Sequence, residues 1–143
     1  MRTPRPRPGF TLLELLIVLA LTAILAALAY PTYTDQVMRM RRTEAAAVLA
    51  EAAHFMERHG ADNLRYDQDL AGVSTTLPDL LRTSPKASGS PHYELSLQSV
   101  AIDAFVLQAV PRAGSPQARD PCGTLTLAST GVVGAAIPGC WRR

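Results

Sequence analysis

The sequence predicts an α+β fold in which one long N-terminal helix packs on a small antiparallel sheet. Three observations predict it. An apolar run extends from Phe10 to Tyr30, residues 31–59 carry an apolar stripe at helical spacing, and short segments near the C-terminus alternate apolar and polar residues. With 143 residues the chain has room for one domain with a modest core.

The apolar run, residues 10–30, has the length of a membrane-spanning helix, because roughly 20 residues cross the ~30 Å hydrocarbon layer. Arg2, Arg5 and Arg7 precede it, separated by prolines that disfavour a regular helix. Positive charges favour the cytoplasmic side of a membrane. We therefore expect a single span with a cytoplasmic N-terminus and an exported C-terminal region.

Glu14 is the one carboxylate inside this apolar run. An ionised carboxylate in a bilayer costs on the order of 2.5 to 3.5 kcal/mol and needs a partner. One partner is local, because Thr11 and Glu14 have the spacing of a helix-capping box. Another would appear if the chain were cut between Gly9 and Phe10, since the new amino group would precede Glu14 by four residues on the same helical face.

The segment Gly9-Phe10-Thr11-Leu12-Leu13-Glu14-Leu15 resembles the class III signal of type IV prepilins and type II secretion pseudopilins. The resemblance implies the type IV pilin fold, with residues 1–9 as a leader that a prepilin peptidase removes after Gly9. It also implies N-methylation of Phe10 and pairing of Glu14 with the N-terminal amine of an adjacent subunit during assembly.

Pro31 also matches a position of this family. A proline here removes a helical hydrogen bond, so we expect a kink just outside the membrane. The family usually carries glycine eight residues earlier, where this chain has Ala23. Because alanine favours a helix by ~1 kcal/mol over glycine, local melting of this stretch in a filament does not follow from the resemblance.

Residues 31–59 form the amphipathic half of the expected helix, and Gly60 is expected to end it as a C-cap. The basic cluster Arg39, Arg41 and Arg42 suggests a solvated face or a contact with lipid headgroups. The apolar stripe that should cover the sheet consists of Val37, Met40, Ala45, Val48, Leu49, Ala52, Phe55 and Met56.

Residues 60–91 are rich in loop-forming residues, and in a pilin they would be the αβ-loop, here with a turn of helix. Residues 92–143 should form the antiparallel sheet. Alternating patterns predict strands at Tyr93–Leu97, Phe105–Val110 and Cys122–Leu127, with the first turn near Ile102 and Asp103.

Cys122 and Cys140 are the only cysteines, and both lie on the side expected to be exported, where disulfides persist. We expect them to pair, which would contribute roughly 3 kcal/mol in the chain-entropy model. The element Asp120-Pro121-Cys122-Gly123-Thr124-Leu125-Thr126-Leu127, with Gly131 and Cys140-Trp141 after it, resembles the C-terminus of PilE-like minor pilins. The resemblance implies that the segment between Cys122 and Cys140 is the disulfide-bounded D-region, with Trp141 packed against the disulfide.

The sequence contains no nucleophile elbow, P-loop, zinc-helix pair or dinucleotide fingerprint, so we expect no enzymatic activity and no cofactor. We expect no metal either, because His54 and His59 lie on different helical faces. The acidic loop residues Asp62, Asp67 and Asp69 do not have EF-hand spacing. A formal net charge of +2 gives no reason to expect nucleic acid as a partner.

Together these features predict a minor pilin, a structural subunit of a type IV pilus with roles in pilus assembly, adhesion and twitching motility. Its expected partners are major and other minor pilins, the prepilin peptidase and the inner-membrane assembly machinery. We expect it in the bacterial inner membrane, with the C-terminal region periplasmic, and then in the extracellular pilus. Two alternatives remain: a type II secretion pseudopilin, or a secreted binding module or enzyme cut after Ala29.

Overall fold

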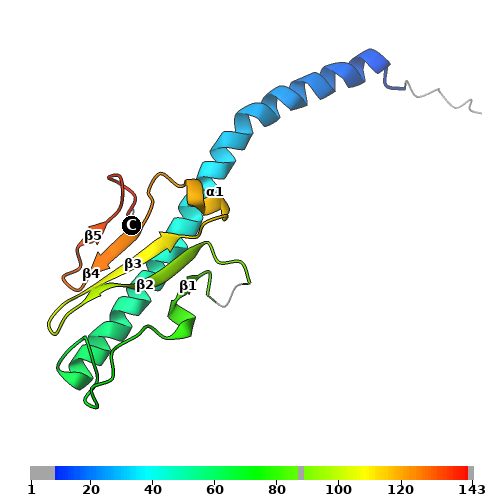
Figure 1. Ribbon diagram of the computed structural model, residues 1–143. Coiled ribbons are helices and arrows are strands. Elements are labelled where there is room, and N and C mark those ends of the chain that lie inside the picture. The colour runs from blue at the N-terminus through cyan, green and yellow to red at the C-terminus, as the bar shows by residue number, and fades with distance from the viewer. Residues whose placement is uncertain (1–8, 87–88, 142–143) are drawn as a thin grey trace, which may run out of the picture. The chain divides into compact units, whose positions relative to one another are not determined.

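The computed structural model describes residues 9–86 and 89–141 and confirms the α+β class, with a long N-terminal helix and an antiparallel sheet (Figure 1). Helix α1 is Leu12–Asn63. The chain divides into two compact units, Met1–Val37 and Met38–Arg143. We call them the anchor unit and the sheet unit. Of the expected leader, only Gly9 lies within the described residues.

Within its described residues, the sheet unit contains five strands that follow one another in chain order, each antiparallel to the next. A β-bulge interrupts the second pairing between Leu97 and Ser99. Two short 3-10 helices, η1 and η2, lie outside the sheet. The elements are η1 Asp79–Leu81, β1 Thr83–Ser84, β2 Tyr93–Val100, β3 Phe105–Pro111, η2 Pro116–Arg119, β4 Leu125–Ala128 and β5 Val133–Gly134.

The core of the sheet unit lies between α1 and one face of this sheet, and Figure 1 shows β2 and β3 running across the helix. The alternation in β2 and β3 accounts for this, because every second side chain of each strand faces the helix. The buried apolar residues are Ala45, Val48, Leu49, Ala52, Met56, Leu77, Leu81, Tyr93, Leu95, Phe105, Leu107, Ala109, Cys122 and Leu125. Met40, which we expected in the stripe, is instead exposed.

The expected end of the helix at Gly60 is wrong, because α1 continues to Asn63. Gly60 serves a different need: a Cβ at this position would collide with the ring of Tyr66. The left-handed residue that ends the helix is Leu64, with φ of 60°. The side chain of Asn63 donates a hydrogen bond to the carbonyl oxygen of His59 at 2.9 Å and so covers one of the last free carbonyls.

The remaining differences concern short elements. The expected third strand begins at Leu125 rather than Cys122, and β1 and β5 were not expected. Helix η2 lies between β3 and β4, in a segment for which the sequence patterns predicted neither a helix nor a strand. Its start follows a local rule, since Ser115 accepts a hydrogen bond from the Gln117 amide at 3.2 Å and Pro116 occupies the first helical position.

Candidate assembly site and disulfide-bounded region

The start of α1 carries the residues expected to act in assembly. Gly9 and Phe10 precede the helix, and the Phe10 side chain is 83% exposed. Thr11 is the N-cap, because its Oγ1 accepts a hydrogen bond from the backbone amide of Glu14 at 3.2 Å. One half of the capping box is therefore present. Within residues 9–86 and 89–141, the carboxylate of Glu14 has no hydrogen-bond or ion-pair partner.

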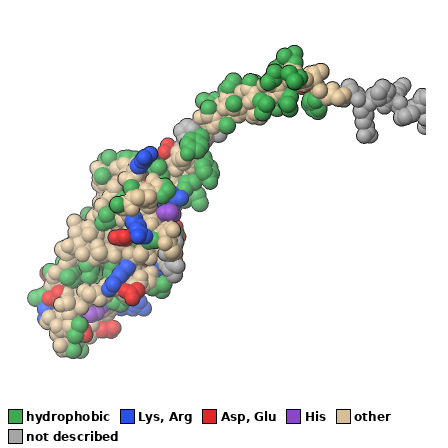
Figure 2. Space-filling view, turned by 45° about the vertical axis from the view of Figure 1, so that its right-hand side comes forward, with side chains coloured by type: hydrophobic (Ala, Val, Ile, Leu, Met, Phe, Trp, Pro, Cys, Tyr) green, Lys and Arg blue, Asp and Glu red, His purple; other side chains and the backbone are tan. Residues whose placement is uncertain are grey.

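The helix of the anchor unit exposes large apolar side chains at positions that lie all around its axis. Figure 2 shows those on the face turned toward the viewer. It is long and apolar enough to span a membrane. Thr22 does not disturb this surface, because its hydroxyl donates to the backbone oxygens of Val18 and Leu19 within the helix. The exposed residues are Leu12, Leu13, Leu15, Leu16, Ile17, Val18, Leu19, Leu21, Ile24, Leu25 and Leu28.

Pro31 lies inside α1, which continues beyond it to Asn63. The proline therefore does not end the helix. The kink expected at Pro31 and the effect of Ala23 on melting remain predictions.

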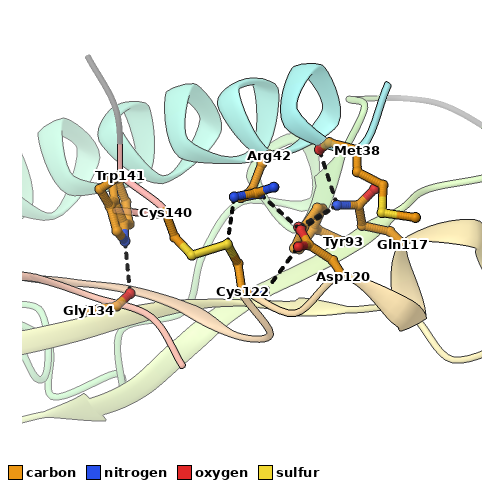
Figure 3. The surroundings of a disulfide bond; sticks show 9 residues. All are labelled: Met38, Arg42, Tyr93, Gln117, Asp120, Cys122, Gly134, Cys140 and Trp141. Atoms are coloured by element: carbon orange, nitrogen blue, oxygen red, sulfur yellow. Dashed lines mark hydrogen bonds and ion pairs between the residues drawn. A yellow bond between two sulfur atoms is a disulfide. The ribbon is translucent and has the colours of Figure 1, made fainter. Parts of the chain in front are cut away.

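The disulfide joins Cys122 to Cys140, with 5.8 Å between their Cα atoms. Strands β4 and β5 both lie inside the segment that it closes. Trp141 packs next to Cys140 against the core, and its indole N–H donates to the carbonyl oxygen of Gly134 at 2.8 Å (Figure 3). This bond fastens the residue after the second cysteine to β5.

A buried polar network links α1 to the start of this segment (Figure 3). The carboxylate of Asp120 is fully buried, and its Oδ2 lies 3.0 Å from Nε of Arg42. Its Oδ1 accepts a hydrogen bond from the backbone amide of Cys122 at 3.0 Å. The Tyr93 hydroxyl donates to Oδ2 at 3.0 Å. Burial, with Asp120 close by, raises the pKa of the Tyr93 hydroxyl far above its ordinary value, so this tyrosine remains a neutral donor.

Gln117 is the centre of the network. Its amide nitrogen lies within hydrogen-bonding distance of three acceptors: Oδ2 of Asp120 at 2.6 Å, the hydroxyl of Tyr93 at 2.9 Å and the carbonyl oxygen of Met38 at 3.2 Å. These contacts join η2 to β2 and to the first turn of α1 in the sheet unit. The network therefore fixes the approach to Cys122 against the helix.

The structure corrects the expected role of Arg42, which we had grouped with Arg39 and Arg41 in a cluster expected to be solvated or to contact lipid headgroups. Its side chain is only 14% exposed and points to Asp120. The sequence does contain a signal for this, because Arg42 precedes the buried Ala45 by three residues and the buried Leu49 by seven. That spacing places it on the buried face of the helix.

The histidines and loop aspartates have separate local roles. His54 contacts Glu57 at 3.3 Å, whereas His59 contacts the hydroxyl of Thr75 at 2.7 Å. Arg65 makes two hydrogen bonds to Asp67 and holds the pKa of that carboxyl below its ordinary value. Asp69 accepts two backbone amides of its own turn. These contacts tie the αβ-loop to itself and to the end of α1.

Comparison with known proteins agrees with this arrangement. Residues 4–30 match the model of the prokaryotic N-terminal methylation motif, and residues 31–126 match the family described as type IV minor pilin ComP, DNA uptake sequence receptor. The fold and the N-terminal motif define a type IV pilin. The chain belongs to this type IV minor pilin family.

Individual relatives match mainly over part of their length. The chain is similar to the type IV wide pilus major component PilA4 of Thermus thermophilus, with 41% identity over 48% of this chain and 53% of that protein. It is similar to the fimbrial protein EcpC of Eikenella corrodens, with 57% identity over 26% of this chain and 24% of that protein. It thus spans about half or less of these relatives.

Among solved structures, the non-core minor pilin PilV of Neisseria meningitidis is similar in fold. The TM-score is 0.52 at 21% identity, and the match covers 73% of this chain and 91% of that one.

Proposed function

We propose that this pilus subunit is a minor pilin that waits in the inner membrane as a single span and enters the filament through its anchor unit. In this proposal the prepilin peptidase cuts between Gly9 and Phe10, Phe10 is methylated, and the sheet unit is periplasmic before assembly. The observation that carries the proposal is the anchor helix itself, which exposes apolar side chains all around and has one carboxylate, that of Glu14, without a partner among the residues that the structure describes.

The role proposed for Glu14 follows from its surroundings. The side chains around it are apolar and exposed, so lipid or other apolar helices must cover them. A carboxylate in such surroundings costs on the order of 2.5 to 3.5 kcal/mol without a partner. The amine of Phe10, released by cleavage in the same or a neighbouring subunit, supplies the opposite charge. Pairing with a neighbour then favours assembled over isolated subunits.

The test compares Glu14→Gln, which removes the charge and keeps the shape, with Glu57→Gln, which removes an exposed carboxylate from the sheet unit. We expect membrane insertion and cleavage of both variants at wild-type levels. In sheared pili the Glu14 variant should fall at least about tenfold, the effect of 1.4 kcal/mol on an equilibrium. The Glu57 variant should stay near wild type. Wild-type amounts of the Glu14 variant in sheared pili would refute the pairing.

The minor status and the contributions to adhesion and twitching motility belong to the same proposal. Quantifying this subunit against the major pilin in sheared pili tests the first, and a small fraction is expected. A deletion strain complemented with the wild-type chain tests the other two.

A second candidate function is DNA binding, which is favoured by one observation: the description of the matched family names a DNA uptake sequence receptor. The charges of the sheet unit give it limited support. Of nine described Lys and Arg residues there, five pair with carboxylates: Arg42, Arg65, Arg82, Lys86 and Arg112. Such pairing lowers the charge available to phosphates.

DNA binding can be tested with the mature protein in detergent and labelled duplexes at two salt concentrations. Saturable binding that weakens with salt and with the double change Arg39→Gln and Arg41→Gln would support the second function. No saturable binding at low salt would exclude it.

A further inference from the structure

The two cysteines of the disulfide differ in how the protein holds them. Cys122 is 2% exposed, its backbone amide donates to Asp120 and its carbonyl oxygen accepts a hydrogen bond from Ala136 at 3.0 Å. Cys140 is half-buried and lies outside any helix or strand, next to the exposed Pro138 and Gly139. Cys140 is therefore the more exposed of the two cysteines.

A cation contacts only one of these sulfurs among the residues that the structure describes. Nη1 of Arg42 donates to Sγ of Cys122 at 2.5 Å (Figure 3). When the disulfide is open, the same N–H group faces a thiol that can ionise. A neighbouring arginine stabilises a thiolate and lowers the pKa of a cysteine thiol. Cys122 is therefore the cysteine whose thiolate would have a positively charged neighbour.

Other groups around Cys122 limit this effect. Asp120 is paired with Nε of the same guanidinium and would repel a thiolate. Its charge is already shared with the Gln117 amide and the Tyr93 hydroxyl, both of which donate to Oδ2. Nη1 of the guanidinium lies against the sulfur, whereas Nε lies beside Asp120 as an ion pair without a hydrogen bond. Burial of Cys122 also disfavours its charged form, so we expect a moderate stabilisation of the thiolate.

We propose that Cys140 is the site at which external thiols and disulfides react, that Cys122 is the internal nucleophile and leaving group, and that Arg42 is its positioning residue. In closure, the Cys140 thiolate attacks an external disulfide, expels one thiolate and forms a mixed disulfide. The Cys122 thiolate then attacks the Cys140 sulfur and expels the second. Two electrons pass from the two cysteines to the external disulfide, and the two cysteine protons leave with the released thiols.

Opening follows the reverse course. An external thiolate attacks the Cys140 sulfur, and Cys122 departs as a thiolate held by Arg42. A leaving thiol of lower pKa departs faster, so Arg42 speeds opening. In closure Cys122 is the attacking group, and the larger fraction of thiolate near neutral pH speeds its attack on the Cys140 sulfur. These reactions take place in the sheet unit and do not depend on the role proposed for Glu14.

The first test measures reduction of the mature protein by glutathione in detergent near neutral pH, with free thiols trapped and counted over time. Arg42→Met should slow reduction by about threefold to tenfold, as expected for a thiol pKa change of one to two units. Arg42→Lys should keep most of the wild-type rate. Arg41→Met, the matched control, should leave the rate unchanged. A purely structural role for Arg42 predicts the opposite sign, because a loosened fold exposes the disulfide.

The second test locates the reacting sulfurs without relying on rates. Single-cysteine variants Cys122→Ser and Cys140→Ser, treated with oxidised glutathione, should form the mixed disulfide several-fold faster at Cys140 than at Cys122. In Cys140→Ser, the ultraviolet absorbance of the Cys122 thiolate should titrate below the ordinary pKa of about 8.5. Adding Arg42→Met should raise that midpoint by about one to two units.

Three results would overturn the proposal. They are reduction of Arg42→Met at or above the wild-type rate, preferential glutathione attachment to Cys122, or an unchanged thiol midpoint on loss of Arg42. If circular dichroism shows that Arg42→Met is unfolded, the folded variant Arg42→Lys provides the test, because it keeps the positive charge. A threefold to tenfold slower reduction of Arg42→Lys would then contradict the proposal.

Discussion

The two parts of helix α1 use apolar residues in opposite ways. In the anchor unit, Leu16 and its large apolar neighbours are more than half exposed or close to it, whereas Leu49 in the sheet unit is fully buried under the sheet. The sheet unit therefore covers its own apolar stripe. The anchor unit does not, so its burial must come from lipid or from other chains. Helix α1 thus runs from the anchor unit, whose apolar surface needs lipid or other chains to cover it, into the sheet unit, which buries its own apolar stripe.

The largest expected effect tests this difference directly. Leu49→Ala should lower the free energy of unfolding of the sheet unit by about 2 to 5 kcal/mol, because it leaves a cavity in the core. Leu16→Ala makes the same chemical change on an exposed position and should stay within about 0.5 kcal/mol. Denaturant titration followed by Trp141 fluorescence measures both. Similar losses in the two variants would show that the anchor unit is part of the same folded core.

A second expected effect concerns the buried polar network of the sheet unit. Asp120→Asn leaves the guanidinium of Arg42 without its buried counter-charge and should cost about 3 kcal/mol of unfolding free energy. Asp79→Asn is the matched control, since the ion pair of Asp79 with Arg82 is exposed and should be worth under about 1 kcal/mol. Equal, small effects of both changes would mean that the network does not hold the D-region to the helix.

The smallest expected effect sharpens the description of the helix end. Gly60→Ala would ordinarily stabilise a helix by ~1 kcal/mol. Here the added methyl meets the ring of Tyr66, so we expect a destabilisation of about 1 to 2 kcal/mol. Ala50→Gly, at an exposed helical position, should cost about 1 kcal/mol. A more stable Gly60→Ala variant would show that the Tyr66 ring moves aside freely.

The anchor helix and the longer strands could be predicted from the sequence because each depends on a local pattern. Phe10 to Tyr30 is one long apolar run, and Tyr93–Leu97 and Phe105–Val110 alternate. Strands β1 and β5 have two residues each, and no alternation can be read from two residues. Each of these two strands forms only by pairing with a neighbouring strand, and a local sequence pattern carries no information about that pairing.

The site residues divide in the same way. Glu14 stands out because it is charged where its neighbours are apolar. The buried network does not stand out, since Arg42, Tyr93, Gln117 and Asp120 lie far apart in the sequence and resemble ordinary surface or strand residues. Only the packing of η2 against both α1 and β2 brings them together. Helical spacing alone could have placed Arg42 on the buried face.

Retention of the anchor helix in the mature protein can be tested by the mass of the N-terminal peptide of the native protein recovered from membranes and from sheared pili. We expect both to begin at N-methylated Phe10 and to keep the whole apolar helix. A mature chain beginning at Tyr30, after cleavage behind Ala29, would lack that helix and would refute its role as anchor and assembly surface.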